Sequence, residues 1–300
     1  MLMPVRCTGI DTRCNHIRLV DRIMRILTLS ENTAGKRPKG LLAEYGLSIL
    51  VETDEQKILF DTGQNISVVH NAPLLGVDLR DLDLIVLSHG HYDHTGGLKG
   101  VLAETGEIEV IAHPDIFKKR YVKHETSTTS IGIPYAKTEL EDAGAKFRFR
   151  EEPTRIGDIT VTGEVERKTD FEKIDATLYV EEGDELKGDE LLDDQALVLK
   201  IVKGLFVVLG CAHRGMINTI ECAREITGED KIYGVIGGTH LVAADKVQME
   251  ETVRALQAYK IQRLGVSHCT GPQASARLAD EFGDRFFYNN AGSVIELEDE

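Results

Sequence analysis

The stretch that decides the fold runs from residue 88 to residue 97: Ser88-His89-Gly90-His91-Tyr92-Asp93-His94-Thr95-Gly96-Gly97. Four metal-binding side chains fall within six residues of it, namely His89, His91, Asp93 and His94. The apolar run 82–87 directly before it is typical of a buried strand. Because side chains alternate along extended backbone, His89 and His91 leave this strand pointing the same way. Asp93 and His94 cannot share that direction, so they are placed to hold a second cation; paired divalent ions usually lie about 3.5–4 Å apart.

Two ordinary explanations compete with a catalytic site at this stretch. The polar residues could belong to a simple loop, or they could form a single structural zinc site. Structural zinc sites are usually closed by cysteine with four protein ligands, whereas a set rich in His and Asp leaves a position for water. The stretch therefore favours an open, catalytic metal site.

The pattern H-x-H-x-D-H after an apolar strand resembles the signature of the metallo-β-lactamase superfamily. Asp61, in the run Ile58–Gly63, matches the position of the superfamily's aspartate that orients the metal ligands, as carboxylates behind a metal site often do. The alternative for Asp61 is a plain Asp-Thr-Gly turn. The resemblance implies an α/β fold, an αββα sandwich of two mixed sheets flanked by helices, and the alternation of strands and helices in each half agrees with it.

Composition limits the class of protein. The chain has 300 residues, of which 42% are hydrophobic and 28% charged, as in ordinary globular proteins. A net charge of -15 argues against a nucleic-acid or membrane-surface binder, because neutralising phosphates needs clustered Lys and Arg. No apolar run approaches the roughly 20 residues of a membrane span. The five cysteines form no C-x-x-C pair, which favours a reducing cytoplasm.

The chain reads as one domain, residues 24–300, after a poorly ordered extension, residues 1–23. Met24, just before the first expected strand (residues 25–30), is a candidate natural start. Residues 115–123 are expected to be helical, and residues 126–133 a loop. The acidic run 181–194 is expected to be an exposed insertion that can be removed with modest effect on the core.

Three later histidines each follow an apolar strand and small residues: His213, His240 and His268. Sites in layered α/β folds form at the carboxyl ends of strands, so these histidines are expected to converge with residues 89–94. The simplest assignment gives His89, His91 and His213 to one metal, and Asp93, His94 and His268 to the other. An isolated histidine is more often a core or surface residue, and this alternative is strongest for His240.

One departure from the superfamily pattern concerns residues 210–213, Gly-Cys-Ala-His. Most members supply a bridging aspartate at the end of such a strand, and here no Asp stands there. Either His213 occupies the bridging place and His240 fills another ligand position, or the site holds only one metal tightly. Cys211 and Cys269 could be ligands, but packing as small buried residues explains them equally well, so both are left out of the predicted ligand set.

A wider set of motifs resembles one branch of the superfamily, the branch that includes the 7,8-dihydropterin-6-methyl-4-(β-D-ribofuranosyl)-aminobenzene 5′-phosphate synthases of methanopterin biosynthesis. The motifs, in chain order, are Thr162–Arg167, Asp193–Leu197, Gly210–Gly215 with Asn218-Thr219, Gly237–Leu241 and His268–Gly271. The resemblance implies a transferase in which metal ions neutralise a leaving diphosphate and a cation holds a sugar phosphate. Candidates for that cation are Arg167, Lys168 and Arg214; a surface ion pair is the alternative for Arg167.

Two other functions stay open. One is a hydrolase of a phosphoester, lactone or thioester, in which the metal lowers the pKa of water to about 7 and Asp93 orients the hydroxide. The other is a non-catalytic sensor of a small ligand. One or two divalent ions are expected, zinc first, with iron or manganese as alternatives. The partner is expected to be a small phosphorylated molecule, with His113 and His124 as further contacts if they do not simply pack, and a homo-oligomer is possible.

Overall fold

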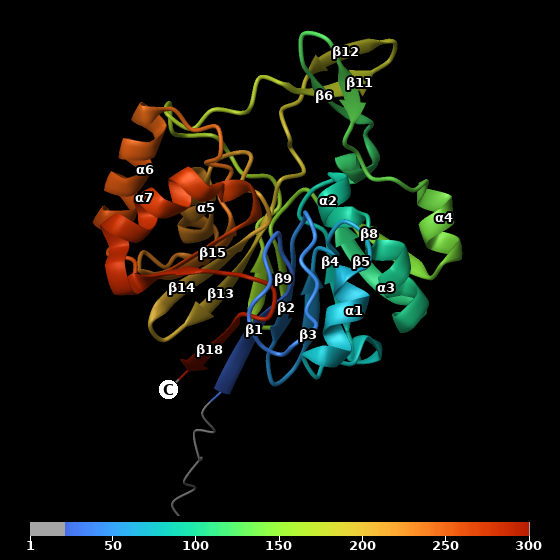
Figure 1. Ribbon diagram of the computed structural model, residues 1–300, viewed down its shortest axis with the longest axis horizontal. Coiled ribbons are helices and arrows are strands. Elements are labelled where there is room, and N and C mark those ends of the chain that lie inside the picture. Colours follow the sequence, from blue (N-terminus) through green and yellow to red (C-terminus); the bar gives the residue numbers. More distant parts are fainter. Residues whose placement is uncertain (1–21, 300) are drawn as a thin grey trace, which may run out of the picture.

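The computed structural model describes residues 22–299, which form two facing sheets with helices on both outer sides (Figure 1). This is the expected αββα sandwich. Residues 1–21 of the expected extension, residues 1–23, lie outside the described residues. Its last two residues belong to the first strand, which begins at Arg22. Among the described residues, no helix is long and apolar enough to cross a membrane.

The first sheet is mixed and has seven strands. β1, β2 and β3 pair antiparallel, whereas β3, β4, β5 and β8 pair parallel. Its strands in spatial order are β18 (Val294–Asp299), β1 (Arg22–Ser30), β2 (Ser48–Glu52), β3 (Lys57–Phe60), β4 (Leu84–Val86), β5 (Ile108–Ala112) and β8 (Ala145–Phe149).

The second sheet is also mixed and has seven strands. β14, β15, β16 and β17 run parallel, and β9, β10 and β13 complete it antiparallel. Its strands in spatial order are β17 (Phe286–Tyr288), β16 (Arg263–Ser267), β15 (Ile232–Gly238), β14 (Gly204–Leu209), β13 (Ala196–Ile201), β10 (Ile159–Val161) and β9 (Thr154–Ile156).

The alternation of side chains along each strand builds three apolar cores. In β14, Phe206 and Val208 pack between the sheets, while Val207 packs under the helices of its own side. The first sheet is covered by α1 (Ser67–Leu74), α3 (Leu98–Thr105) and α4 (Lys137–Asp142), and the second by α5 (Met216–Thr227), α6 (Lys246–Ala258) and α7 (Pro272–Phe282). Shorter helices are α2 (Tyr92–Thr95), η1 (Leu79–Asp81), η2 (Pro114–Phe117), η3 (His268–Thr270) and η4 (Gly283–Arg285).

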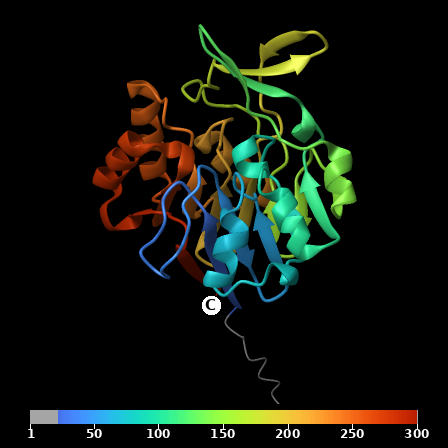
Figure 2. The same ribbon diagram turned by 45° about the vertical axis from the view of Figure 1, so that its right-hand side comes forward.

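A third, four-stranded sheet stands above the sandwich, and we call it the cap (Figure 2). Its strands are β12 (Glu185–Gly188), β11 (Leu178–Glu182), β6 (Arg120–Lys123) and β7 (Thr128–Ser130). The expected helix over residues 115–123 is therefore wrong: η2 ends at Phe117, and β6 then pairs with β11. The expected loop 126–133 contains β7. Both segments become strands because they pair with each other and with a distant segment.

The acidic run 181–194 is only partly the exposed insertion expected from the sequence. Its first half forms parts of β11 and β12 in the cap, but Asp189, Asp193 and Asp194 are buried. We call residues 189–195 the supporting segment, because Asp193 accepts the Gly90 N–H and Gln195 donates to the Leu87 carbonyl, each at 2.8 Å. The supporting segment thus holds the loop that carries the first two histidines, and its deletion would remove that support.

Candidate metal centre

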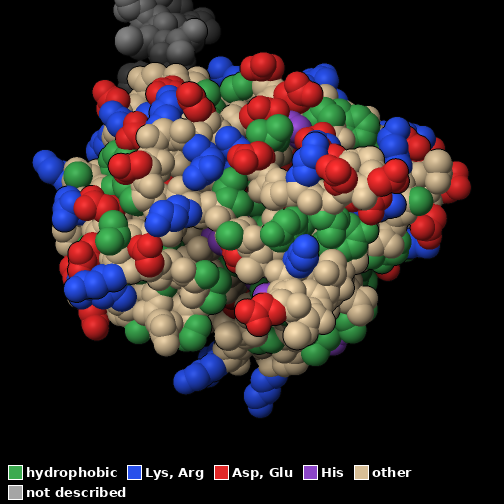
Figure 3. All heavy atoms as spheres, turned by 90° about the horizontal axis from the view of Figure 1, so that it is seen from above, with side chains coloured by type: hydrophobic (Ala, Val, Ile, Leu, Met, Phe, Trp, Pro, Cys, Tyr) green, Lys and Arg blue, Asp and Glu red, His purple; other side chains and the backbone are tan. Residues whose placement is uncertain are grey.

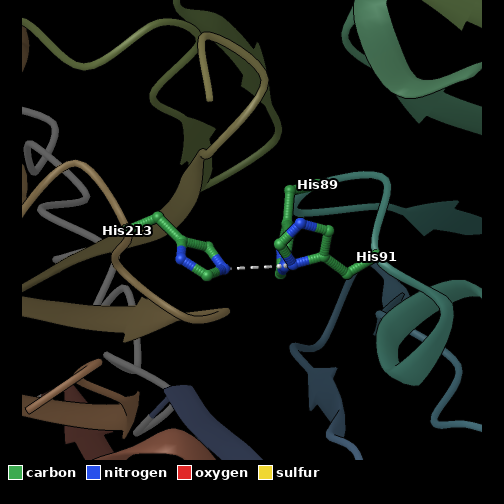
Figure 4. Close-up of side chains that lie close together, drawn as sticks. All are labelled: His89, His91 and His213. Carbon is green, nitrogen blue, oxygen red and sulfur yellow. Dashed lines mark hydrogen bonds between the residues drawn. The ribbon is translucent and has the colours of Figure 1, made fainter. Parts of the chain in front are cut away.

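Three imidazoles converge at the carboxyl ends of two strands, one in each sheet (Figure 4). His89 and His91 follow β4, and His213 follows β14. His89 Nε2 lies 3.1 Å from His91 Nδ1 and 3.2 Å from His213 Nε2. Ligand atoms around a tetrahedral ion with bonds of about 2.0–2.1 Å lie about 3.3 Å apart. The spacing of the three nitrogens therefore fits one cation between them.

A second set of donors lies beside the first. Asp93, His94 and His268 place their ligand atoms within 4.8 Å of one another, and all three side chains are buried. Asp93 Oδ2 lies 3.1 Å from His268 Nε2. The rings of His89 and His94 lie 4.3 Å apart between centroids, so the two sets are in contact. Both three-residue sets expected from the sequence are thus brought together.

Burial sets the protonation of the first set. It holds the pKa values of His89 and His213 well below the ordinary value, and it lowers the pKa of His91 to about 3. Neutral imidazoles are the form that binds a metal. For Asp93, burial acts to raise the pKa, but the hydrogen bond from His268 and the charge of His94 outweigh it and hold the pKa below its usual value. The carboxylate is therefore ionised and ready to bind a cation.

Asp61 is placed to orient ligands of both sets. Its side chain is fully buried, and its Oδ2 lies 2.6 Å from His94 Nδ1. Oδ1 accepts the Ser88 N–H and Oδ2 accepts the Ser88 hydroxyl, whose oxygen lies 2.8 Å from His89 Nδ1. Burial would lower the pKa of His94, but the Asp61 carboxylate overcomes this and raises it to about 9. Asp61 thus fixes which nitrogens face the centre, as expected from its position.

Two residues that the sequence did not suggest hold His268. Asn32 Oδ1 lies 2.9 Å from His268 Nδ1, and Glu31 Oε1 accepts the His268 N–H at 2.7 Å. Because Nδ1 is engaged by Asn32, Nε2 is the nitrogen left to face Asp93. Glu31 and Asn32 directly follow β1, so a polar pair at the end of a strand was the available signal.

Backbone strain is concentrated at this centre. Six non-glycine residues among those described have positive φ, and four of them belong to the centre or adjoin its ligands: Asp61 (61°), Ala212 (54°), His240 (49°) and His268 (51°). Each such residue costs about 1–3 kcal/mol and persists only where the surroundings determine it. Such clustering is typical of a functional site.

Cys211 lies at the junction of the two sets. Its Sγ is 3.1 Å from His94 Nε2. The same sulfur lies within 4.8 Å of ligand atoms of His89 and His94, and within 4.8 Å of those of His268 and Cys269. His213 instead groups with His89 and His91, so Cys211, and not His213, has its ligand atom near members of both sets. The sequence reasoning left this thiol out of the ligand set because a buried cysteine is usually a packing residue.

Comparison with known proteins agrees with this geometry. Residues 42–192 match the family model of the metallo-beta-lactamase superfamily. The chain belongs to the metallo-β-lactamase superfamily. It therefore has the fold of a superfamily of metal-dependent enzymes. The branch expected from its motifs is represented by a relative from Methanocaldococcus jannaschii.

That relative is a 7,8-dihydropterin-6-methyl-4-(beta-D-ribofuranosyl)-aminobenzene-5′-phosphate synthase, 34% identical over 94% of this chain and 99% of its own length. An uncharacterized protein of the same organism is 35% identical over 90% of this chain and 99% of its own length. A crystal structure of a metal-dependent hydrolase of the β-lactamase superfamily superposes with a TM-score of 0.80 and 28% identity, over 92% of this chain and 100% of the other. Identity alone therefore does not choose one activity within the superfamily.

His240 has a different place from the other histidines. It lies outside the four close groups of ligand atoms found among the described residues, although its ring centroid is 4.2 Å from that of His213. Both of its ring nitrogens are buried without a hydrogen-bond partner. As a metal ligand, His240 stays a prediction, and its contacts place it equally well to meet a substrate.

A cavity of about 390 Å³ adjoins the candidate metal centre. Its wall contains hydrophobic and aromatic side chains from the loop before β2, from α2, from the cap and its loops, and from the loop after β15: Tyr45, Tyr92, Val122, Ile131, Leu178 and Val242. Its lining also includes His124 from the cap and four of the expected ligands, His91, Asp93, His213 and His268. Seen from above, hydrophobic side chains surround the hollow in the middle of this face, where some histidine surface is visible (Figure 3).

The expected phosphate clamp does not line this cavity in the part of the chain that is described. Arg214 donates to the carbonyls of Val165 and Glu190, Arg167 donates to the Glu172 carbonyl, and Lys168 pairs with Glu225. As substrate-binding residues, these three cations stay a prediction that no contact supports.

The motif around Arg167 has a structural role instead. Glu172 is 2% exposed and accepts the N–H groups of Ile217 and Asn218 at the start of α5. His113 likewise pairs with a protein group, Glu164, at 3.1 Å. The Glu172 contacts hold the start of α5, which begins three residues after His213.

Proposed function

We propose that this enzyme joins a dihydropterin methyl diphosphate to a ribofuranosylaminobenzene 5′-phosphate, as in methanopterin-type pterin biosynthesis. The observation that carries the proposal is the cavity, whose lining combines residues of the two-set metal centre with aromatic and aliphatic side chains. Such a cavity suits a flat ring that ends in an anionic group. Similarity to the synthase over both halves of the sandwich supports the same conclusion.

The reaction breaks the bond between the pterin methylene carbon and a diphosphate oxygen. A bond from that carbon to the arylamine nitrogen forms, and the nitrogen loses a proton. Divalent metal ions, when bound, supply the positive charge that a leaving diphosphate requires. His240 lines the cavity with two unpartnered ring nitrogens, so it is available to accept the amine proton.

The aromatic wall would orient the rings. Tyr45 lies on the loop between β1 and β2, and its ring centroid is 4.9 Å from that of His268. A pterin or aminobenzene ring packed on Tyr45 would therefore lie next to the second set of ligands. Because no Lys or Arg lines the described part of the cavity, the phosphates depend on the metal centre and on histidines such as His124.

The metal we propose is zinc, since imidazole, carboxylate and thiol donors in a tetrahedral spacing suit it. We also propose a reducing, cytoplasmic location. It is supported by three free cysteines among the described residues, of which Cys211 and Cys269 lie at the metal centre.

The decisive experiment supplies metal-loaded protein with the pterin diphosphate, with and without the ribofuranosylaminobenzene phosphate. Diphosphate release and the coupled product are followed by mass spectrometry. Release that depends on the arylamine, together with a condensed product, is the expected result. Diphosphate release without coupling, or no reaction, would contradict the proposal.

A matched pair of tyrosines tests the ring contact. Tyr45 and Tyr288 are each 53% exposed, but only Tyr45 lines the cavity. Loss of an aromatic contact worth about 0.5–1.5 kcal/mol predicts that Tyr45→Ala raises KM about 2- to 12-fold. Tyr288→Ala should leave KM unchanged. Equal effects of both substitutions would remove Tyr45 from the substrate site.

A second candidate function is metal-dependent hydrolysis, favoured by the close superposition with the metal-dependent hydrolase. The same ligands would then activate water instead of neutralising a diphosphate. A panel of phosphodiesters, lactones and thioesters, tested on the same metal-loaded protein, separates the two. Turnover of one of these esters without any coupled product would favour hydrolysis.

A further inference from the structure

Two buried thiols meet beside the metal centre. Cys211 follows β14 and is 2% exposed, while Cys269 follows β16 and is 7% exposed. The strand between them, β15, ends at Gly238. A Cβ at that position would lie 2.7 Å from Cys269 Sγ and 3.2 Å from the Cys211 Cα. The glycine therefore leaves the space in which the thiols approach the metal ligands.

The two thiols have different neighbours. Cys211 Sγ faces nitrogen atoms, with His94 Nε2 at 3.1 Å and a ligand atom of His89 within 4.8 Å. Cys269 Sγ instead accepts the His240 N–H at 3.3 Å and lies 3.6 Å from the Cys211 carbonyl oxygen. Cys211 is thus close to ligands of both sets, whereas Cys269 forms a close group with Cys211 and with His268, a ligand of the second set.

Charge balance also favours a further anionic ligand. The two sets comprise five imidazoles and a single carboxylate, that of Asp93. Two divalent ions bring four positive charges into a buried site, where uncompensated charge is strongly unfavourable. Asp61 contributes from behind the ligands, but it already accepts hydrogen bonds from Ser88 and faces His94. A thiolate at the junction would add the missing charge where both ions can share it.

Packing alone does not account for the Cys211 environment. A cysteine that acts as a small apolar residue is surrounded by carbon atoms. Here the side chain ends among imidazoles, and the next residue, Ala212, holds a positive φ of 54°. The strained turn directs both Cys211 and His213 to the same centre.

We infer that Cys211 binds the metal centre as a thiolate placed between the two ions. Binding releases the thiol proton to solvent, and no oxidation is involved. A thiolate makes the centre favour zinc, iron or cobalt over magnesium, calcium and manganese, which prefer oxygen ligands. This inference depends on the metal centre and not on the substrate proposed above.

Cobalt provides the test, because thiolate bound to Co²⁺ absorbs in the near ultraviolet whereas imidazole and carboxylate ligands do not produce that charge-transfer band. The metal-free protein is loaded with Co²⁺ alone, and the spectrum and bound cobalt are measured. The native protein should show the sulfur-to-cobalt band. Cys211→Ser should lose it, and the neighbouring Cys269→Ser should retain it.

A third variant guards against simple loss of binding. Cys211→Asp places a carboxylate at the junction, so this variant should bind cobalt without showing the sulfur band. The inference is overturned if the cobalt-loaded native protein has no such band, or if the band survives in Cys211→Ser. Because no substrate is present, these outcomes stand whether or not the protein couples a pterin.

Discussion

Replacing Arg120 by Met tests how the cap is joined to the metal loop. Arg120 is 1% exposed; its Nε donates to Asp189 and its Nη2 to Asp193, each at 2.7 Å. Asp193 in turn accepts the N–H of Gly90, which lies between His89 and His91. Met keeps most of the apolar stem but removes the cation. Two buried carboxylates then lie close together without a cation.

The expected loss follows from this burial. Breaking a buried ion pair costs about 3–5 kcal/mol, because it leaves a charge that neither water nor a partner stabilises. Asp193 keeps the Gly90 N–H and Asp189 keeps the Leu191 N–H, so the loss does not double for the two carboxylates. We expect about 4 kcal/mol, which is a large part of the total stability of about 5–15 kcal/mol usual for domains.

Guanidinium unfolding of the chelated protein, followed by circular dichroism, measures this loss without contributions from bound metal. With a slope of about 4 kcal/mol per molar, the midpoint should fall by about 1 M. Lys119→Met is the control one residue away. Its pair with Glu181 has exposed fractions of 69% and 31%, so its loss should stay below about 1 kcal/mol.

The double variant Arg120→Met with Asp193→Asn sharpens the test. Asn removes one buried charge but keeps an oxygen for the Gly90 N–H, so it should recover part of the lost stability. A midpoint for Arg120→Met no lower than that of Lys119→Met would refute the reasoning. Lack of any recovery in the double variant would show that the loss comes from packing.

Three further predictions concern the centre itself. His89→Ala and His268→Ala should each reduce the metal retained after dialysis, measured by elemental analysis, while the exposed His70→Ala should not; full stoichiometry in either ligand variant would remove that residue from the set. Asp61→Asn should weaken metal binding about 10- to 100-fold in competition with a chelator. Burial raises the pKa of Asp194 from 3.8 to about 7, so the folded state holds this proton more tightly and the stability from this group falls as pH rises between those values. Asp194→Asn should therefore stabilise the chelated protein at pH 8 more than at pH 4, and an equal effect at both pH values would contradict the shift.

The convergence of the expected ligands could be predicted because their signals are local. Four of them fall within six residues, and the later histidines each close an apolar strand. Parallel strands bring such ends to one edge of a sheet, so His213 and His268 converge with residues 89–94 although they are far apart along the chain. The sandwich itself followed from the alternation of strands and helices, which depends on side-chain period and not on distant contacts.

The cap could not be predicted from local pattern. Residues 115–123 are basic, but Arg120 pairs with acids 69 and 73 residues further along the chain. In the same way, an acidic run normally means a solvated surface, and only the buried arginine makes Asp189 and Asp193 interior residues. The expectations for the basic stretch 115–123 and for the acidic run 181–194 failed for one reason. The charges of either segment are unfavourable in the interior unless they pair with those of the other.

The residues behind the ligands were missed for a similar reason. Asn32 and Glu31 meet His268 across 236 and 237 residues of sequence, and their place directly after β1 does not identify that partner. Cys211 was an open alternative in the sequence, because spacing alone does not reveal its contact with His94 across 117 residues. Asp61 was found because the resemblance supplied its position.

The charge distribution ties anion binding to the metals. The chain carries a net charge of -15, and no Lys or Arg lines the described part of the cavity. The nearest buried cation of the supporting network, Arg120, is already committed to two carboxylates. A phosphorylated substrate would therefore meet a negative surrounding potential unless the centre holds its ions. We therefore expect metal occupancy to govern the binding of a phosphorylated substrate as well as the chemistry, because the described lining of the cavity offers the anion no Lys or Arg.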